Sequence, residues 1–375
     1  MTTTFKIVLK PIWILSLLLL AGSFSITFPA YGQSDGEQII QVVPNRVTVS
    51  ELKLRGRIQS QFANSFGSNS NLIEEAGEYS SFEMRRARLG VQGKLYGNWD
   101  FMLEANVLSS VNLDAATLTY SALPIANITF GKAKPRFGHE QNTSSASILT
   151  FERTLLDGLL NGGKPLGLRV HGSSGAFSYY LGVYNGESVN TSRMGSELDT
   201  YLYNASAGLD VASLTGMSER GITARFRADM LYRGDQDGGY YPYEDSYALS
   251  AHFGYDVIDL RTEYMTGNRI DDNRVEGFYL MPSWYVVPGR LQLVARYERV
   301  SADNGLALGQ NRYADRVPQL YGAGSRYSAV YGGVNYRIYG DNLKLMAGLE
   351  IAENNGDESA IGRVTTLFTG FRMQF

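Results

Sequence analysis

Arginines recur in this chain as pairs in which a single residue separates the two members. The pairs are Arg55 with Arg57, Arg86 with Arg88, and Arg225 with Arg227. A guanidinium group binds two oxygens of a phosphate or carboxylate at once, so several of them in a row favour anionic ligands. Residues two apart lie on the same face of a β-strand. The pairs therefore predict strands that present a basic face to small anions.

The segments around these arginines alternate between apolar and polar residues, which is the pattern of a strand with two different faces. In the first such segment, 51–62, leucine, isoleucine and phenylalanine occupy one face, and lysine, arginine and glutamine occupy the other. The alternation recurs along the chain in about sixteen segments of roughly ten residues, the length of a tilted strand that crosses a membrane. We therefore predict an all-β fold, a transmembrane antiparallel β-barrel of about 16 strands over residues 51–375.

The predicted connections alternate in length. Short turns are predicted at 96–98, 123–124, 173–175, 287–289 and 339–342, and longer polar links at 63–80, 133–165, 186–201, 233–245 and 301–325. Short turns at one end and long loops at the other are typical of outer-membrane barrels. Because an exposed sheet edge is not tolerated in lipid, strands of this kind must close into a barrel.

The barrel determines where the arginines lie. An arginine on the lipid face at mid-membrane costs about 2–4 kcal/mol, so the three pairs are expected to face the lumen. A barrel of about sixteen strands encloses an aqueous channel. The arginines would then favour anions, or they would pair with wall carboxylates in a neutral network. The candidate carboxylates are Glu104, Asp229, Asp259, Glu263 and Glu298.

The first 32 residues have the organisation of a signal peptide. Lys6 and Lys10 precede an apolar stretch at 12–21, and Ala30-Tyr31-Gly32 fits a cleavage site. A membrane anchor is the alternative, but the apolar stretch is too short to span a bilayer. We expect cleavage near Gly32 and a short periplasmic segment at 33–50.

Composition excludes several other classes of protein. The chain has no cysteine, and its histidines, His139, His171 and His252, lack the spacing of metal ligands, so we expect neither a metal nor another cofactor. A formal charge of −3 argues against a nucleic-acid partner. A barrel enzyme such as a phospholipase would need a nucleophile beside a histidine, and neither His139 nor His171 has such a motif nearby.

Several stretches, in this order and spacing, resemble the phosphate-selective porin O and P family. They are Glu-Met-Arg-Arg-Ala-Arg-Leu-Gly-Val-Gln-Gly-Lys-Leu-Tyr-Gly-Asn-Trp-Asp-Phe-Met-Leu-Glu at 83–104, Ile-Thr-Phe-Gly-Lys-Ala-Lys-Pro-Arg-Phe-Gly at 128–138, Phe-Glu-Arg at 151–153 and Gly-Val-Tyr-Asn-Gly at 182–186. The resemblance implies a sixteen-stranded, usually trimeric porin with an inward-folded third loop, which is 133–165 here. It implies wall arginines at Arg86, Arg88, Arg225 and Arg227, with Arg85 as a further candidate, and a basic constriction at Lys132, Lys134 and Arg136.

These observations together predict an outer-membrane porin for passive diffusion of small hydrophilic solutes, with a preference for anions such as phosphate. Its partners would be outer-membrane lipids, small anionic or polar solutes and two further copies of the chain. Two alternatives remain. The first is a non-selective porin, because the chain is acidic overall and its basic constriction is short. The second is the barrel enzyme. The loop at 133–165 could also be an ordinary extracellular cap.

Overall fold

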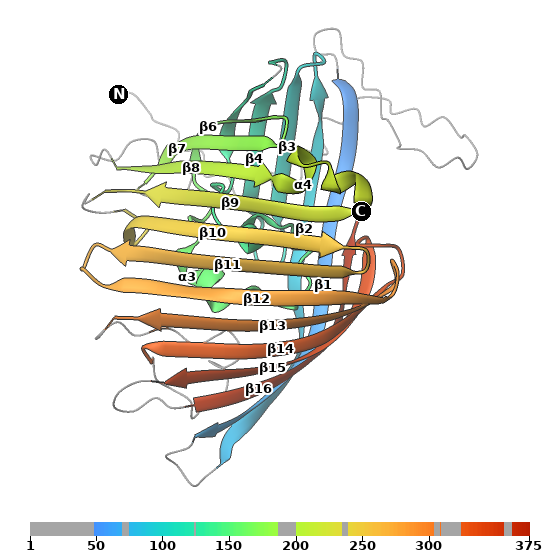
Figure 1. Ribbon diagram of the computed structural model, residues 1–375, viewed down its shortest axis with the longest axis vertical. Coiled ribbons are helices and arrows are strands. Elements are labelled where there is room, and N and C mark those ends of the chain that lie inside the picture. Colours follow the sequence, from blue (N-terminus) through green and yellow to red (C-terminus); the bar gives the residue numbers. More distant parts are fainter. Residues whose placement is uncertain are drawn as a thin grey trace, which may run out of the picture.

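Sixteen antiparallel strands close into one barrel, in which each strand pairs with its sequence neighbours and β1 pairs with β16 (Figure 1). The computed structural model describes residues 49–69, 75–123, 125–186, 200–234, 239–303, 308, 324–355 and 362–375. The predicted signal peptide and the segment 33–50, apart from its last two residues, lie outside these ranges. The predicted all-β barrel and its strand number are confirmed.

The strands differ in length around the barrel. The first eight are β1 (Val49–Asn69), β2 (Glu75–Leu95), β3 (Trp99–Asn106), β4 (Asn112–Tyr120), β5 (Asn127–Lys132), β6 (Leu166–Ser174), β7 (Phe177–Asn185) and β8 (Tyr201–Asp210). The last eight are β9 (Ile222–Tyr232), β10 (Tyr243–Tyr255), β11 (Ile258–Arg269), β12 (Arg274–Val287), β13 (Leu291–Ala302), β14 (Arg326–Arg337), β15 (Leu343–Asn355) and β16 (Gly362–Gln374).

Alternation along each strand separates an outer apolar face from an inner polar face. In β13, Gln292, Arg296 and Glu298 are buried inside the barrel, whereas Leu293 and Tyr297 are exposed on the outside. A shift of one residue in the register would exchange the two faces, so the lipid requirement fixes the pairing.

The two ends of the barrel carry different connections. At one end, called here the turn end, most strands are joined by tight turns within two residues of the predicted positions. Two links differ from the prediction: the tight turn at 256–257 between β10 and β11 was not predicted, and the link between β8 and β9 contains α4 (Val211–Leu214) and the 3-10 helix η1 (Met217–Arg220). The sequence pattern did not predict these helices. The opposite end is called the loop end.

The predicted link at 63–80 is wrong over most of its length. β1 continues to Asn69 and β2 begins at Glu75, so this hairpin extends the sheet at the loop end. Its polar residues resemble a loop, but Phe62 and Phe82 are directly paired across the strands, with ring centroids 4.9 Å apart. Strands beyond the membrane need no continuous apolar face, because water satisfies their side chains.

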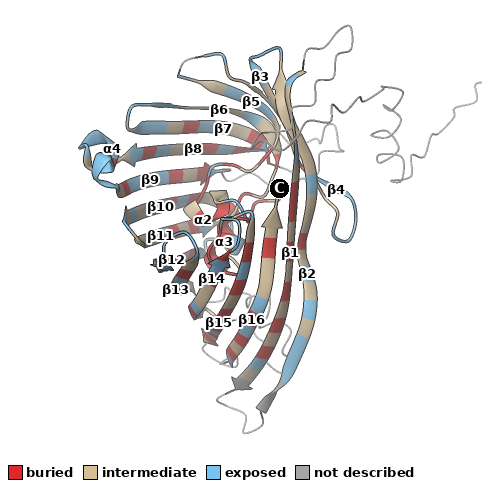
Figure 2. Cartoon of the chain, turned by 90° about the vertical axis from the view of Figure 1, so that its right-hand side faces the viewer, coloured by how far each residue is buried: buried red, intermediate tan, exposed pale blue. Residues whose placement is uncertain are grey.

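Between β5 and β6 the chain turns into the barrel, and residues 133–165 are called here the inner segment. It contains two short helices, α2 (His139–Asn142) and α3 (Leu155–Leu160), which Figure 2 shows within the curve of the wall. Among the described residues, no helix has the length and hydropathy needed to cross a membrane.

Candidate functional site

The inner segment is held to the wall by buried cations that bind its backbone. Arg372, 1% exposed, donates hydrogen bonds to the carbonyl oxygens of Ile148, Thr150 and Phe151, each at 2.7 Å. Lys344 donates to the Ile148 carbonyl at 3.0 Å. A charged donor strengthens each of these bonds relative to a neutral one. The path of residues 148–151 is therefore fixed by cations of β15 and β16.

A second anchor joins several carboxylates to one guanidinium. Arg296 lies 3.4 Å from Glu140, 3.1 Å from Glu350 and 4.0 Å from Glu298, and all four side chains are buried. Arg296 also donates to the Glu152 carbonyl at 2.8 Å. Since Glu140 belongs to the inner segment and the other three residues to β13 and β15, this cluster ties α2 to the wall.

Wall carboxylates also accept hydrogen bonds from the backbone of the inner segment. Asp229 accepts from the Gly138 N–H at 2.9 Å, and Glu263 accepts from the His139 N–H at 2.5 Å. Inside the segment, Asp157 is 5% exposed, and burial with the nearby Glu140 raises its pKa to about 7. These three carboxylates, Asp229, Glu263 and Asp157, are therefore buried, either between the segment and the wall or within the segment.

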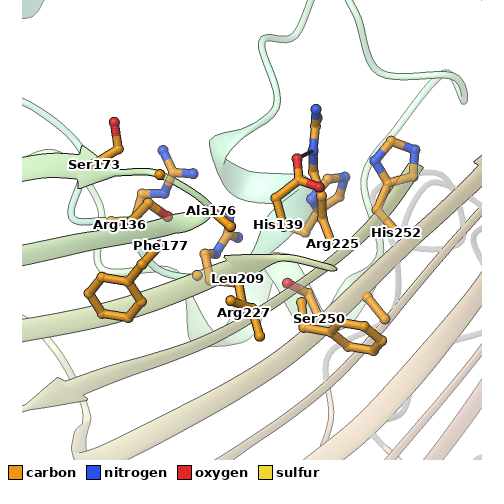
Figure 3. Close-up of a pocket in the computed structure, with 16 residues that line it drawn as sticks. Arg136, His139, Ser173, Ala176, Phe177, Leu209, Arg225, Arg227, Ser250 and His252 are labelled. Atoms are coloured by element: carbon orange, nitrogen blue, oxygen red, sulfur yellow. Dashed lines mark hydrogen bonds and ion pairs between the residues drawn. The ribbon is translucent and has the colours of Figure 1, made fainter. Parts of the chain in front are cut away.

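A cavity of about 330 Å³ lies at the turn-end side of the inner segment (Figure 3). Arg136 of the segment and Arg225 and Arg227 of β9 line it, together with His139 and His252. Arg225 is 61% exposed and pairs with Asp210 at 2.8 Å, and Arg227 pairs with Asp229 at 3.0 Å. The pKa of His139 falls to about 3 because it is buried beside Arg227 and Arg261, so the ring is neutral.

Arg136 differs from the other cavity arginines in its pairing. Its backbone is fixed by Asn204, whose side-chain oxygen accepts the Arg136 N–H at 2.7 Å. Its side chain is exposed, and among the described residues it has no ion-pair partner. Arg136 thus presents a guanidinium to the cavity from a rigid backbone position.

The arginines of β1 and β2 form a separate group on the opposite part of the wall. Arg57 lies directly across from Arg88 and donates to Ser145 at 2.7 Å and Ser144 at 3.3 Å. Arg88 pairs with Glu104 at 3.4 Å and with Asp114 at 3.0 Å. The serines of the inner segment therefore face a basic wall.

The two remaining arginines predicted on these strands are placed differently. Arg86 is 3.6 Å from Glu152, while Arg55 donates to the sulfur of Met102 at 2.9 Å. Arg85 stands at a β-bulge and pairs with Glu152 at 2.5 Å. The predicted lumen arginines thus divide into those with carboxylate partners and those, such as Arg57, that bind neutral groups.

The three residues predicted as a basic constriction, Lys132, Lys134 and Arg136, lie in different surroundings. Lys134 bonds back onto the inner segment, to the carbonyl and side-chain oxygens of Gln141 at 2.8 and 3.3 Å. Burial and the nearby Arg153 lower its pKa to about 7. Lys132 ends β5 and is partly buried. Of the three, Arg136 lines the cavity.

Sequence reasoning did not select the residues that anchor the inner segment. Arg296, Arg372 and Lys344 each stand at an inward position of an alternating strand, which is the signal that could have identified them. The pairing partners proposed for a neutral wall network were partly correct. Glu104, Asp229, Asp259 and Glu298 each pair with an arginine, whereas Glu263 accepts from the backbone of the inner segment.

The chain was compared with known proteins. It matches the family model described as phosphate-selective porin O and P over residues 52–375. Porin O of Pseudomonas aeruginosa is 34% identical over 110 residues, which cover 27% of this chain and 24% of that protein. The matched part therefore spans about a quarter of the relative.

Many solved structures share the fold, among them a porin and an outer-membrane protein. An anion-selective porin from Comamonas acidovorans superposes with a TM-score of 0.62 at 14% identity, covering 87% of this chain and 99% of that one. OmpT of Vibrio cholerae, in its trimer form, gives 0.55 at 11% identity, covering 86% and 99%. The family match covers nearly all of the barrel, and the chain belongs to the phosphate-selective porin O and P family.

Proposed function

We propose that the chain forms a water-filled channel in the outer membrane of a Gram-negative cell, through which small hydrophilic solutes diffuse and anions such as phosphate are preferred. Membership of the porin family supports a channel, and a closed barrel of sixteen strands is wide enough for one. On this proposal the turn end faces the periplasm and the loop end the cell exterior. The inner segment narrows the lumen.

One observation supports the anion preference above the others: acidic groups inside the barrel are buried, whereas some of the arginines are exposed. Glu140 of the inner segment and Glu263, Glu298 and Glu350 of the wall are at most 6% exposed, and they are bound by backbone N–H groups of the segment or by Arg296. Arg136 and Arg225 are exposed at the cavity. A solute in the lumen would therefore meet more basic than acidic groups, although the chain as a whole is acidic.

The local field matters more than the net charge. Charges on exterior loops are screened over about 8 Å in physiological salt. Charges in a narrow lumen with low-dielectric walls are focused and act strongly on a passing ion. Rows of guanidinium groups then favour anions, as charged rings do in other pores.

The test is the reversal potential of single channels across a tenfold gradient of potassium chloride. An ideally anion-selective pore gives about 59 mV in the direction of chloride. Wild type should have the same sign, and Arg136→Gln/Arg225→Gln should move toward zero. Lys134→Gln should have a smaller effect, because Lys134 is turned into the inner segment.

The matched control is Arg220→Gln/Arg290→Gln, which removes two exposed arginines at the turn end and should leave the potential unchanged. A wild-type potential that favours potassium would replace the proposal with a non-selective porin. Absent conductance together with hydrolysis of the bilayer lipid would favour a barrel enzyme.

We further propose that the channel is a homotrimer. β5 has six residues, a length of about 20 Å, and a tilt of about 40° leaves a rise of about 15 Å. That is less than the apolar band of about 25 Å in such barrels. A neighbouring copy would cover the part of the short wall that lipid cannot solvate. One of the similar structures, OmpT, is a trimer.

A further inference from the structure

Arg136 stands at the apex of a three-residue turn at the start of the inner segment. The N–H of Phe137 donates to the carbonyl oxygen of Pro135 at 3.1 Å, and Arg136 is the residue between them. A turn closed by a hydrogen bond between residues two apart is a γ-turn. The turn itself uses neither the N–H nor the carbonyl of its central residue. Both groups must therefore find partners outside the turn.

The side-chain amide of Asn204, on β8, binds both of these groups. Its oxygen accepts the Arg136 N–H at 2.7 Å, and its nitrogen donates to the Arg136 carbonyl at 3.0 Å. The same nitrogen donates to the Met230 carbonyl on β9 at 2.9 Å, so the amide is itself fixed to the wall. Asn204 is 3% exposed. We call Asn204 with these three hydrogen bonds the amide clamp.

The chemistry of the clamp specifies a carboxamide. Asparagine and glutamine carry an oxygen acceptor next to a nitrogen with two donor hydrogens. A serine hydroxyl has a single hydrogen to donate, and an ionised carboxylate only accepts. The amide of Asn204 thus binds the backbone of Arg136 on both sides, as a neighbouring strand would, at a place where the inner segment has no strand.

The nearest wall carboxylate is already bound to other groups. Asp229 accepts from the Ser206 hydroxyl at 2.5 Å and from the Gly138 N–H at 2.9 Å. It also pairs with Arg227 at 3.0 Å. Arg136 forms no ion pair with any residue that the structure describes, and its side chain lies at the cavity (Figure 3). The placement of its guanidinium therefore depends on its backbone, not on a salt bridge.

We infer that Asn204 is a positioning residue for the anion preference of the channel, and that it acts through Arg136. The inference rests on the proposed function, in which Arg136 attracts anions. With the amide clamp in place, the turn keeps one orientation and the guanidinium stays exposed at the cavity beside Arg225 and Arg227. Without the clamp, the Arg136 backbone loses its partners and the turn rearranges. The guanidinium then moves away from the other two, and their joint attraction for one anion weakens.

The first measurement tests the clamp without reference to ions. A nitroxide label on Arg136→Cys reports how freely the turn moves, because the natural chain has no cysteine. Loss of two neutral hydrogen bonds shifts the balance between the fixed and the loosened turn on the order of 30-fold. The electron paramagnetic resonance spectrum should therefore show an immobilised label beside Asn204 and a mobile label in the Asn204→Leu chain. An immobilised label in both chains would overturn the clamp.

The second measurement is a double-mutant cycle on the reversal potential across a gradient of potassium chloride. Asn204→Leu should move the potential of the wild type toward that of Arg136→Gln. In a chain that already carries Arg136→Gln, the same substitution should cause no further change, because no guanidinium is left to position. Equal shifts in the two backgrounds would show that Asn204 does not act through Arg136, and the inference would fail. Asn204→Ala is a second variant with the same expected results, and single-channel conductance shows that each barrel is folded.

The matched control is Asn335→Leu. Asn335, on β14, is 1% exposed and donates to the Leu149 carbonyl of the inner segment at 2.9 Å, so it is another buried asparagine that binds the backbone of this segment. Its loss should lower the urea midpoint and leave the reversal potential unchanged. A shift as large as that of Asn204→Leu would mean that any loosened contact alters selectivity, which contradicts a specific role for Asn204. A wild type that prefers potassium would refute the proposed function and the selectivity role with it, whereas the spin-label result refutes the clamp alone.

Discussion

Arg296 offers the sharpest test of how the inner segment is held. Its guanidinium lies within 4.0 Å of carboxylate oxygens of Glu140, Glu298 and Glu350, and Arg296 itself is 2% exposed. Arg296→Met keeps most of the side-chain volume and removes the charge. The three carboxylates would then face one another in a space that water does not reach.

The expected cost follows from the burial of the cluster. Removal of one partner from a buried ion pair typically destabilises a protein by about 3–5 kcal/mol, because the other charge is left uncompensated. Here the cost falls on the contact between α2 and the wall, since Glu140 is the member from the inner segment. A change of about 3 kcal/mol shifts the equilibrium between docked and undocked segment by roughly 10²-fold. We expect larger, noisier single-channel currents.

The assay compares wild type, Arg296→Met and the control Arg290→Met in planar bilayers, with urea unfolding as a second measurement. Arg290 is exposed in the turn before the same strand, so its loss should change neither the current nor the urea midpoint. Adding Glu298→Gln to Arg296→Met should restore part of the wild-type behaviour, because one uncompensated charge is removed. Wild-type currents and an unchanged urea midpoint for Arg296→Met would refute the reasoning.

Three further predictions concern register, assembly and pH. Since the chain has no cysteine, a single introduced cysteine is the only thiol that a reagent can modify. A water-soluble thiol reagent should modify Arg55→Cys, which faces the inside of the barrel, and should not modify Leu54→Cys, which faces outward. The reverse result would show that the register is wrong. Mass measurement in mild detergent should give three copies of the chain. A bismaleimide should link copies of Leu118→Cys, on the short wall, but not copies of Leu349→Cys, on the tall wall. A monomer that conducts would contradict the trimer. The pKa of Asp157 is raised from 3.8 to about 7, so its protonated form stabilises the fold below pH 4 and this contribution is lost as the pH rises to about 7. The urea midpoint of Asp157→Asn minus that of wild type should therefore be larger at pH 8 than at pH 5. A difference that does not change with pH would contradict this.

The barrel itself was predictable because lipid imposes one rule on every strand. An apolar residue at every second position, as in 343–351, is sufficient to fix both the strand and its face. The same rule fails outside the membrane, where either face can be polar. That is why the extension of β1 to Asn69 and the helices α4 and η1 could not be recognised from the pattern.

The candidate site was predicted less completely, because its geometry depends on contacts between residues far apart in the sequence. The spacing of Arg225 and Arg227 indicated a common face, but not that Arg136 would join Arg225 at one cavity. Lys134 and Arg136 share the same spacing and yet diverge, since residues 133–165 are not a strand and the period of two does not apply. Alternation determines which side of the wall a residue faces, and the inner segment determines which inward residues remain exposed inside the barrel.

The inner segment therefore has two physically distinct effects on the interior of the barrel. It reduces the width of the lumen, which any inserted loop would do. It also supplies the N–H groups of Gly138 and His139 and brings Glu140 to Arg296, so that carboxylates of the wall are satisfied without solvent. An unpaired carboxylate would otherwise have to remain hydrated and facing the lumen, since burying it alone is too costly. A chain with more acidic than basic residues can thus line the inside of its barrel with arginine, because the segment that lies inside the barrel also withdraws the negative charge from that interior.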